Sequence, residues 1–336
     1  MSDPTTGPAA VEAVDLVKRF GDNTAVDHVS FSVPQGTVLG LLGPNGAGKT
    51  TTVRMLTTLS RPTSGTGRVA GHDVVAEPDQ VRRSMGLTGQ AATVDELLTA
   101  RENLRLVGGL AGMPRRSIKP VADDLLERFA LTEAADRVVK TYSGGMRRRL
   151  DLAVSLVAAP PVLFLDEPTT GLDPRSRTDL WDVLRGLVRE GTTLLLTTQY
   201  LEEADQLADD IVVIDRGRVI AHGTPTALKA QAGAASVVLT LTHEHDLARA
   251  EQVVRSCVGE VYVEAGRRRL TAAGGLADMS RIGELLAAAD VAVDDLGLKR
   301  PSLDDVFLRL TGHRAEAQDD PGSAGADEAD LEEAVR

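Results

Sequence analysis

Residues 43–50 read Gly-Pro-Asn-Gly-Ala-Gly-Lys-Thr, a glycine-rich loop that ends in a lysine and a hydroxyl residue. The apolar run 38–42 before it is typical of a buried strand, and the pattern of 49–59 after it predicts a helix. Small residues in such a loop let successive backbone N–H groups turn towards a phosphate, and the helix N-terminus adds positive potential. A chance glycine-rich turn is the alternative, but the complete pattern between strand and helix argues against it.

This loop therefore predicts a nucleotide phosphate site. Lys49 would place a point charge between the β- and γ-phosphates, and Thr50 would offer a hydroxyl to Mg²⁺. We expect the nucleotide to contact the whole loop and the first turn of the helix, namely Gly43, Pro44, Asn45, Gly46, Ala47, Gly48, Lys49, Thr50 and Thr51.

Two carboxylates follow a second apolar run. Residues 162–165, Val-Leu-Phe-Leu, predict a buried strand that ends in Asp166 and Glu167. Ligands of open α/β sheets bind at the carboxyl edge of the strands, so both acids would lie beside the phosphate loop. There Asp166 would hold Mg²⁺ and Glu167 would polarise the attacking water. A solvated turn is the alternative, and the intact phosphate loop argues against it.

A third element, Ser143-Gly144-Gly145, precedes a predicted helix at 146–159. A hydroxyl, two bare amides and a helix N-terminus make an anion site, although Ser-Gly-Gly alone more often marks only a helix cap. Placed between the phosphate loop and the acid pair, it makes the chain resemble the ATP-binding subunits of ABC transporters. The resemblance implies that Ser143, Gly144 and Gly145 cap the γ-phosphate of ATP held by a second chain. Two copies of the chain would then form a homodimer that sandwiches two ATP molecules with Mg²⁺.

The resemblance assigns three more residues to the nucleotide site. Phe20 occupies the position of the ring that stacks on adenine, and a core phenylalanine is the alternative. Gln90 matches the glutamine that reaches Mg²⁺ and the water, and a plain polar loop residue is the alternative. Asp173, in Gly-Leu-Asp, matches the loop that contacts the partner's site, although an Asp that begins a turn before proline would look the same.

One position departs from the family pattern. After the apolar strand 193–197 the family usually has a histidine that contacts the γ-phosphate, whereas this chain has Gln199. Glutamine can donate a hydrogen bond to the phosphate but cannot carry a proton or a positive charge. We therefore expect slow but real hydrolysis in which Gln199 takes part, without a histidine-like titration from this position.

Three stretches resemble one branch of the family, the daunorubicin-resistance type of ATP-binding subunit, in which glutamine at this position is usual. They are Tyr-Ser-Gly-Gly-Met-Arg-Arg-Arg at 142–149, Thr-Thr-Gln-Tyr-Leu-Glu-Glu-Ala-Asp at 197–205 and Leu-Asp-Asp-Val-Phe-Leu at 303–308. The resemblance covers about 11–310. It implies export of drugs, other antibiotics or complex lipids through a separately encoded integral-membrane permease, with this chain held peripherally at the cytoplasmic face of the cell membrane.

The three arginines in the first of these stretches need separate treatment. Consecutive residues on a helix fan over about 200°, so Arg147, Arg148 and Arg149 cannot all face one ligand. Contact of one of them with phosphate or with the membrane subunit is one hypothesis. A solvated helix face is the simpler interpretation of the set.

Composition limits the partners. The chain has 336 residues and a formal net charge of −12, which argues against a polyanion-binding protein, and its 3% of aromatic residues offers few stacking surfaces for bases. No apolar stretch approaches the roughly 18 residues that would span a bilayer, so we expect no direct membrane span and no nucleic-acid partner. The single cysteine, Cys257, excludes an intramolecular disulfide.

The order of elements predicts an α/β fold, a P-loop NTPase domain of the ABC type over 11–231. Strands at 11–18, 29–33 and 38–42 would build an antiparallel edge sheet beside the phosphate loop. The strands at 162–165, 193–197 and 211–215, with the helices between them, would form a mostly parallel core sheet. A helical subdomain is expected at about 91–159.

The remaining residues predict a second, smaller domain. Within 235–312 the pattern reads β-α-β-β-α-β, which suggests a small α+β unit of the ferredoxin-like kind, with dimer support or regulation as a hypothesis. A helix at 303–310 then carries an apolar face, which either joins the core or packs on a partner subunit. We expect disorder at 1–10 and in the acidic tail 315–336.

Two classes of function fit these features. One is the ATPase subunit of a bacterial exporter, and the other is a soluble ABC ATPase that acts on ribosomes or DNA. Machines of the second class typically carry two cassettes or a long basic or coiled insertion. This chain has one phosphate loop and no basic insertion, so the sequence favours the exporter.

Overall fold

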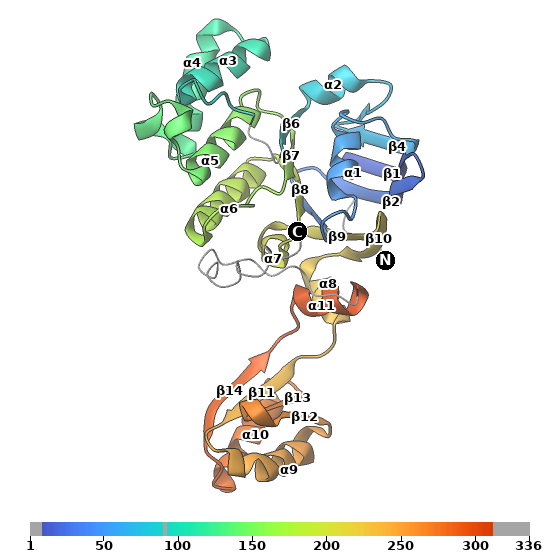
Figure 1. Cartoon of the computed structure of the whole chain (residues 1–336), viewed down its shortest axis with the longest axis vertical. Helices are drawn as coiled ribbons and strands as arrows, with labels where there is room; N and C mark the ends of the chain where they lie inside the picture. The colour runs from blue at the N-terminus through green and yellow to red at the C-terminus, as the bar shows by residue number, and fades with distance from the viewer. Residues whose placement is uncertain (1–8, 90–92, 312–336) are drawn as a thin grey trace, which may run out of the picture.

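The computed structural model describes residues 9–89 and 93–311. It is elongated, as Figure 1 shows, with a large unit of sheets and helices at one end and a small four-stranded unit at the other. Two short helices lie side by side between them, α8 (Pro225–Gln231) and α11 (Leu303–Thr311). Because the chain enters the small unit after α8 and leaves it before α11, the small unit is attached through two chain segments.

The antiparallel sheet of the large unit has four strands in the order β2-β1-β4-β5. The sequence analysis predicted parts of the first two strands and missed the other two. The glycines of β4 interrupt the alternating pattern by which a strand is recognised in a sequence. They nevertheless let β4 pair closely with β1, because a Cβ atom at Gly65 (φ +82°) would lie 2.1 Å from the backbone oxygen of Asp15. The strands are β1 (Ala9–Phe20), β2 (Asn23–Pro34), β4 (Ser64–Val69) and β5 (His72–Asp73).

The central sheet has six strands in the order β10-β9-β3-β8-β7-β6. The five strands β9, β3, β8, β7 and β6 are parallel, and β10 forms one edge of the sheet antiparallel to β9. Placing 38–42 in the edge sheet was wrong, because all five of its residues are buried and such a strand needs cover on both faces. The strands are β3 (Val38–Leu42), β6 (Met85–Thr88), β7 (Val162–Asp166), β8 (Thr193–Thr198), β9 (Asp210–Asp215) and β10 (Arg218–Gly223).

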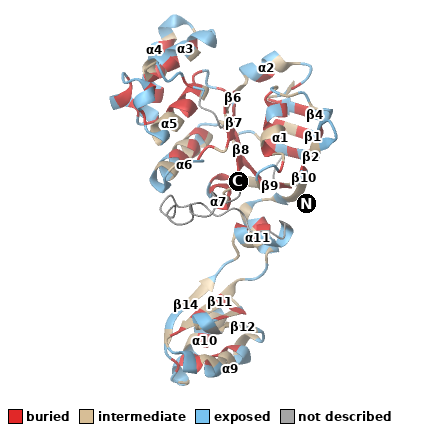
Figure 2. Cartoon of the chain, in the orientation of Figure 1, coloured by how far each residue is buried: buried red, intermediate tan, exposed pale blue. Residues whose placement is uncertain are grey.

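Helices cover both faces of the central sheet, and Figure 2 shows buried residues concentrated in its strands and on the inward helix faces. One apolar cluster joins the sheet to α1, α2 and the antiparallel sheet, and a second joins it to the other helices. The predicted helix at 146–159 in fact begins at Gly144 and ends at Ser155. The helices are α1 (Lys49–Leu56), α2 (Pro78–Arg83), α3 (Ala100–Leu110), α4 (Arg115–Arg128), α5 (Gly144–Ser155), α6 (Pro174–Arg189) and α7 (Leu201–Leu207).

The small unit has its own core. Its strands pair antiparallel in the order β12-β13-β11-β14, and both helices pack on one face of the sheet against alternate residues such as Val237 and Leu239. The chain order β-α-β-β-α-β is the order read from the sequence. The elements are β11 (Ser236–Leu241), α9 (Leu247–Val258), β12 (Val261–Glu264), β13 (Arg269–Ala273), α10 (Leu276–Ala288) and β14 (Val293–Lys299).

Helix α11 returns to the large unit instead of joining the small sheet. Leu303, Val306 and Phe307 are buried in the same apolar cluster as α7 and α8, and Arg309 donates a 2.8 Å hydrogen bond to the backbone oxygen of Gln231. Of the two roles left open for its apolar face, the structure therefore supports packing in the core of its own chain. Leu310, expected on that face, is partly exposed.

Candidate nucleotide site

The loop 43–50 connects β3 to α1 and depends on its glycines. Gly46 (φ +78°) and Gly48 (φ +105°) adopt left-handed backbone angles, and a Cβ at Gly48 would lie 2.5 Å from the backbone oxygen of Ala25. A Cβ at Gly43 would lie 2.1 Å from the backbone oxygen of Ile214 on β9. These close contacts hold the loop against β2 and β9, so its conformation is fixed by the fold.

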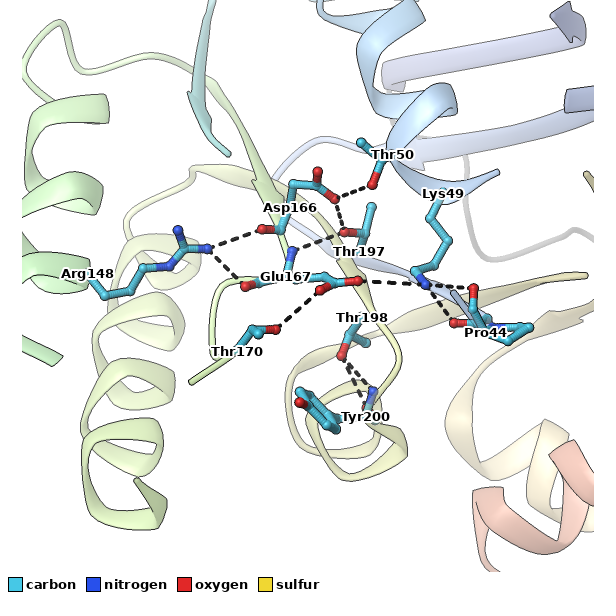
Figure 3. Close-up of polar contacts among 11 residues, drawn as sticks. Pro44, Lys49, Thr50, Arg148, Asp166, Glu167, Thr170, Thr197, Thr198 and Tyr200 are labelled. Atoms are coloured by element: carbon cyan, nitrogen blue, oxygen red, sulfur yellow. Dashed lines mark hydrogen bonds and ion pairs between the residues drawn. The ribbon is translucent and has the colours of Figure 1, made fainter. Parts of the chain in front are cut away.

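Lys49 folds back over this loop and is only 4% exposed (Figure 3). Its Nζ donates to the backbone oxygens of Gly43 (2.7 Å) and Pro44 (3.1 Å) and lies 3.9 Å from Oε1 of Glu167. The loop lines a cavity of about 180 Å³ with Ala25, Glu167 and the first residues of α1. A buried ammonium beside a helix N-terminus creates positive potential, which favours the binding of a phosphate.

Asp166 and Thr50 meet at the end of β7. The Thr50 hydroxyl donates to Oδ1 of Asp166 over 3.1 Å, and the Thr197 hydroxyl donates to the same oxygen over 2.5 Å. The Asp166 side chain is buried, and hydroxyl and carboxylate oxygens are the ligands that Mg²⁺ prefers. These two residues therefore fit a magnesium site, as the sequence predicted for them.

Glu167 has an unusual backbone conformation for a residue with a side chain, with φ +50°. Its N–H donates to the backbone and side-chain oxygens of Thr197 (3.1 Å each), and its Oε2 accepts a 3.3 Å hydrogen bond from the Thr170 hydroxyl. Left-handed conformations of this kind cost about 1–3 kcal/mol and persist where surrounding contacts impose them. The hydrogen bonds with Thr197 therefore hold Glu167 in this backbone conformation.

The Glu167 carboxylate faces a larger cavity of about 630 Å³, also lined by Asn45, Gly144, Thr170 and Gln199. Among the described residues, Oε1 of the Gln199 amide has no hydrogen-bond partner although it is buried. This oxygen can accept a hydrogen bond from a water molecule or a ligand in the cavity, because leaving a buried polar atom unpaired costs about 1–3 kcal/mol. Gln199 lies where the sequence analysis expected it.

Three other predicted residues lie on the surface of the chain. Ser143 caps α5, since its Oγ accepts a hydrogen bond from Met146 N (3.2 Å), and Gly144 beside it is exposed. Asp173 caps α6, and hydrogen bonds from the Ser176 side chain and backbone lower its pKa. Phe20 is 54% exposed with the Lys18 ammonium 4.9 Å from its ring centroid, so it is not a core phenylalanine. Gln90 lies outside the described residues.

Comparison with known proteins places this chain in a family. The family model described as "ABC transporter" matches residues 26–170. The chain is 52% identical over 310 residues to the daunorubicin resistance ATP-binding protein DrrA2 of Streptomyces coeruleorubidus, with 91% of this chain and 96% of that protein covered. It belongs to the ATP-binding subunits of ABC transporters.

Other similar proteins agree with this membership. The daunorubicin/doxorubicin resistance ATP-binding protein DrrA of Streptomyces peucetius is 50% identical, with 91% of this chain and 94% of that protein covered. The Nod factor export ATP-binding protein I of Ralstonia nicotianae is 46% identical, with 67% and 70% covered. A solved structure titled "Structure of ATP binding subunit of ABC transporter" superposes with a TM-score of 0.61 at 28% identity and covers 66% of this chain and 92% of its own. The chain is thus an ABC ATPase.

The ABC ATPase contains a second set of buried polar contacts that the sequence analysis did not identify. The three consecutive arginines of α5 are partly buried and each has a different partner within the chain. Arg147 pairs with Glu96 (2.8 Å), and Arg149 donates to the backbone oxygen of Phe129 (3.2 Å). Arg148 reaches the end of β7, where its guanidinium donates to the backbone oxygens of Asp166 and Glu167. A solvated face is therefore the wrong interpretation of the set.

Glu203 is a fully buried acid on α7, the helix that begins two residues after Gln199. The Trp181 indole donates to its Oε1 over 3.4 Å. Burial raises the pKa of this carboxyl. The side chains of Thr198 and Thr169 and the indole favour the ionised carboxylate and so oppose this increase, but only in part. No sequence signal distinguished it from the exposed Glu202 beside it.

Within residues 9–89 and 93–311, no helix combines the length and the apolar character needed to cross a bilayer.

Proposed function

We propose that this chain binds Mg-ATP, hydrolyses it in a two-chain sandwich and uses the energy to drive export of a small organic compound through a separate permease. The observation that carries the proposal is the placement of Glu167. Its carboxylate lies 3.9 Å from the Lys49 ammonium, on a strained backbone, next to the Thr50–Asp166 pair. That arrangement sets a base beside a phosphate site and a metal site, which hydrolysis of a nucleotide requires.

Each residue of the phosphate site has a role in this proposal. Backbone N–H groups of residues 45–51 and the Lys49 ammonium would hold the β- and γ-phosphates. Thr50, Asp166 and Gln90 would hold Mg²⁺, which would neutralise charge on the phosphates. Glu167 accepts the proton of the attacking water, and the Gln199 amide donates to the γ-phosphate. The exposed ring of Phe20 stacks on adenine.

The proposed homodimer explains residues that the single chain leaves on its surface. Ser143, Gly144 and Gly145 stand at the N-terminus of the twelve-residue helix α5, so their hydroxyl, amides and helix dipole form an anion site open to a second chain. There they would cap the γ-phosphate held by the partner's loop. Asp173, exposed at the N-terminus of α6, would contact the partner's site from the neighbouring loop.

The proposed assembly extends to the membrane. The similar proteins named above are resistance or export proteins, so we assign this chain to the export of drugs, antibiotics or lipid-like compounds, held by its permease at the cytoplasmic face of the cell membrane. We place the ATP-binding domain at 11–231, with its helical subdomain at about 91–159, and limit the accessory domain to 235–299, because α11 packs in the core of the large unit. None of these similar proteins is named for ribosomes or DNA, which leaves the soluble-machine alternative without support.

The proposal is tested by Glu167→Gln, which keeps the shape of the side chain and removes the base. We expect ATP affinity close to wild type, loss of most turnover and an ATP-bound dimer detectable by size-exclusion chromatography with light scattering. Asp182→Asn, at an exposed acid of α6, is the matched control. Near-normal hydrolysis by Glu167→Gln would refute the assignment of the base.

Membrane recruitment is tested separately. The full chain is expressed with and without the protein of the adjacent reading frame, and the pelleted fraction and Mg-ATPase rate are compared. Recruitment of the chain to the membrane by a neighbouring protein with several membrane spans supports its role as the ATPase subunit of a transporter. A chain that stays in the supernatant with an unchanged ATPase rate would contradict it.

A further inference from the structure

Arg148 joins helix α5 to the strand that carries the catalytic acids. Its guanidinium donates to four backbone oxygens: Nε to Pro168 (2.8 Å), Nη1 to Gly89 (2.7 Å), and Nη2 to Asp166 (3.2 Å) and Glu167 (3.0 Å). The side chain is 11% exposed, and Figure 3 shows it extending from α5 towards Asp166 and Glu167. One planar group therefore fixes three successive carbonyls around the acid pair.

The neighbouring arginines show that this contact is specific to one position. Arg147 and Arg149 bind Glu96 and the backbone of Phe129, both of which belong to the helical part that contains α5. Only Arg148, among these three, reaches the segment after β7. Because its guanidinium carries five N–H donors in one rigid, permanently charged plane, it can hold four carbonyls at once, more than the three donors of lysine or the two of glutamine can serve.

A second residue of α5 extends the same connection. Asp151 lies one helical turn after Arg148, is almost fully buried and approaches its Nη1 to 3.7 Å. It accepts hydrogen bonds from the backbone N–H of Thr93 (2.7 Å) and from the Thr93 hydroxyl. Arg148 binds Gly89 and Asp151 binds Thr93, so α5 contacts the chain on both sides of residues 90–92.

These contacts bear directly on the orientation of Glu167. The backbone of Glu167 is held at φ +50° between Thr197, which binds its N–H, and Arg148, which binds its C=O. Removing the guanidinium would leave these buried carbonyls without their charged donor and let the peptide relax towards an ordinary conformation. A misplacement of about 1 Å at a reacting group can cost about 100-fold in rate.

We propose that Arg148 is a positioning residue that sets the Glu167 carboxylate and couples it to the position of α5. The proposal rests on the two-chain sandwich of the proposed function, in which Ser143 at the start of α5 caps ATP in the partner's loop. Arg148 lies five residues further along, about 7.5 Å at 1.5 Å per residue. Capping of the partner's nucleotide is thereby transmitted to the base of the chain's own site, which links the two sites.

The test compares Arg148→Gln and Arg148→Lys with the matched controls Arg147→Gln and Arg149→Gln in the full chain. ATP affinity is measured with a fluorescent nucleotide, and kcat and the Hill coefficient come from steady-state ATPase assays. For Arg148→Gln we expect a 10- to 100-fold lower kcat with ATP affinity within about twofold of wild type, and a Hill coefficient that falls from above 1 to 1. Arg148→Lys should recover part of kcat, and both controls should stay near wild type.

Several outcomes would overturn the proposal. A kcat for Arg148→Gln equal to that of Arg149→Gln would remove the positioning role, and a parallel loss of ATP affinity would make the effect merely structural. A wild-type Hill coefficient of 1 would remove the coupling between sites. If Arg148→Gln does not fold, Arg148→Lys takes its place in the test. The proposal then requires a lower kcat with unchanged ATP affinity in that variant. Failure of the proposed function is recognised separately, by wild-type protein that does not hydrolyse ATP.

Discussion

Truncation of Phe307 tests how the small unit is attached. Phe307 is 4% exposed on α11, a helix of nine residues that reaches the large unit only after the chain has passed through the small unit. With Leu303 and Val306 it supplies the apolar contacts to the cluster around α7 and α8. Phe307→Ala therefore removes the largest of the three side chains that anchor the helix.

The expected magnitude follows from this burial. Truncation of a buried phenylalanine to alanine costs about 3–5 kcal/mol. Since each 1.4 kcal/mol changes an equilibrium tenfold, local opening of α11 should increase by about two to four orders of magnitude. A short helix near the end of the described chain opens far more cheaply than the sheets, so the loss should stay local.

The measurement is hydrogen–deuterium exchange followed by mass spectrometry of peptides that cover α11, α8 and the central sheet. We expect α11 to lose protection, α8 to lose part of it and the central sheet to keep it, with ATP binding at the distant loop 43–50 unchanged. The matched control is Leu308→Ala on the same helix, whose side chain is 40% exposed, and its exchange should change less than about tenfold. Equal exchange in the two variants would refute the assignment of Phe307 as the anchor.

Three further predictions concern the site. Gly48→Ala should abolish nucleotide binding, as measured by a fluorescent nucleotide, because its φ of +105° and the 2.5 Å approach to Ala25 O leave no place for a methyl group. Gln199→Ala should lower kcat and Gln199→His should restore or raise it; unchanged rates in both variants would remove Gln199 from the site. Burial raises the pKa of Glu203 above its ordinary 4.5, so ionisation weakens the fold as pH rises above that value. The Tm of Glu203→Gln relative to wild type should therefore increase with pH, whereas that of the exposed Glu202→Gln should not.

The sequence predicted the parts of the site that are local. The strand before the loop 43–50, the helix after it and the strand before Asp166 each show their own pattern within a few consecutive residues, an apolar run or a helical period. The glycine positions of the loop were also informative, since glycine is the residue that adopts left-handed backbone angles most readily. These features agree with the structure to within a few residues.

Features that depend on distant contacts were missed or misplaced. The strand β4 carries two glycines among six residues, and only the close approach to β1 explains why they belong in a sheet. The three arginines at 147–149 are equivalent as a pattern, and their different partners lie about 20 to 59 residues away in the chain. Glu202 and Glu203 are likewise adjacent and identical in the sequence, and only the packing of α7 makes one exposed and the other buried.

Strand order explains why the phosphate loop and the acid pair form one site. The loop follows β3 and the acids end β7, and β8 lies between these strands in the sheet. Thr197 of β8 therefore sits where it can serve both acids: its hydroxyl donates to Asp166 and accepts from the N–H of Glu167. No motif marks this threonine, yet its place between the two strands lets it hold Asp166 and Glu167 in one common geometry. Arg148 binds the same acids from the opposite side through their carbonyls, so residues 166–168 are held by the sheet on one side and by α5 on the other. Under the positioning role that we propose for Arg148, a movement of α5 relative to the sheet would change the orientation of Glu167 and thereby connect subunit contact to hydrolysis.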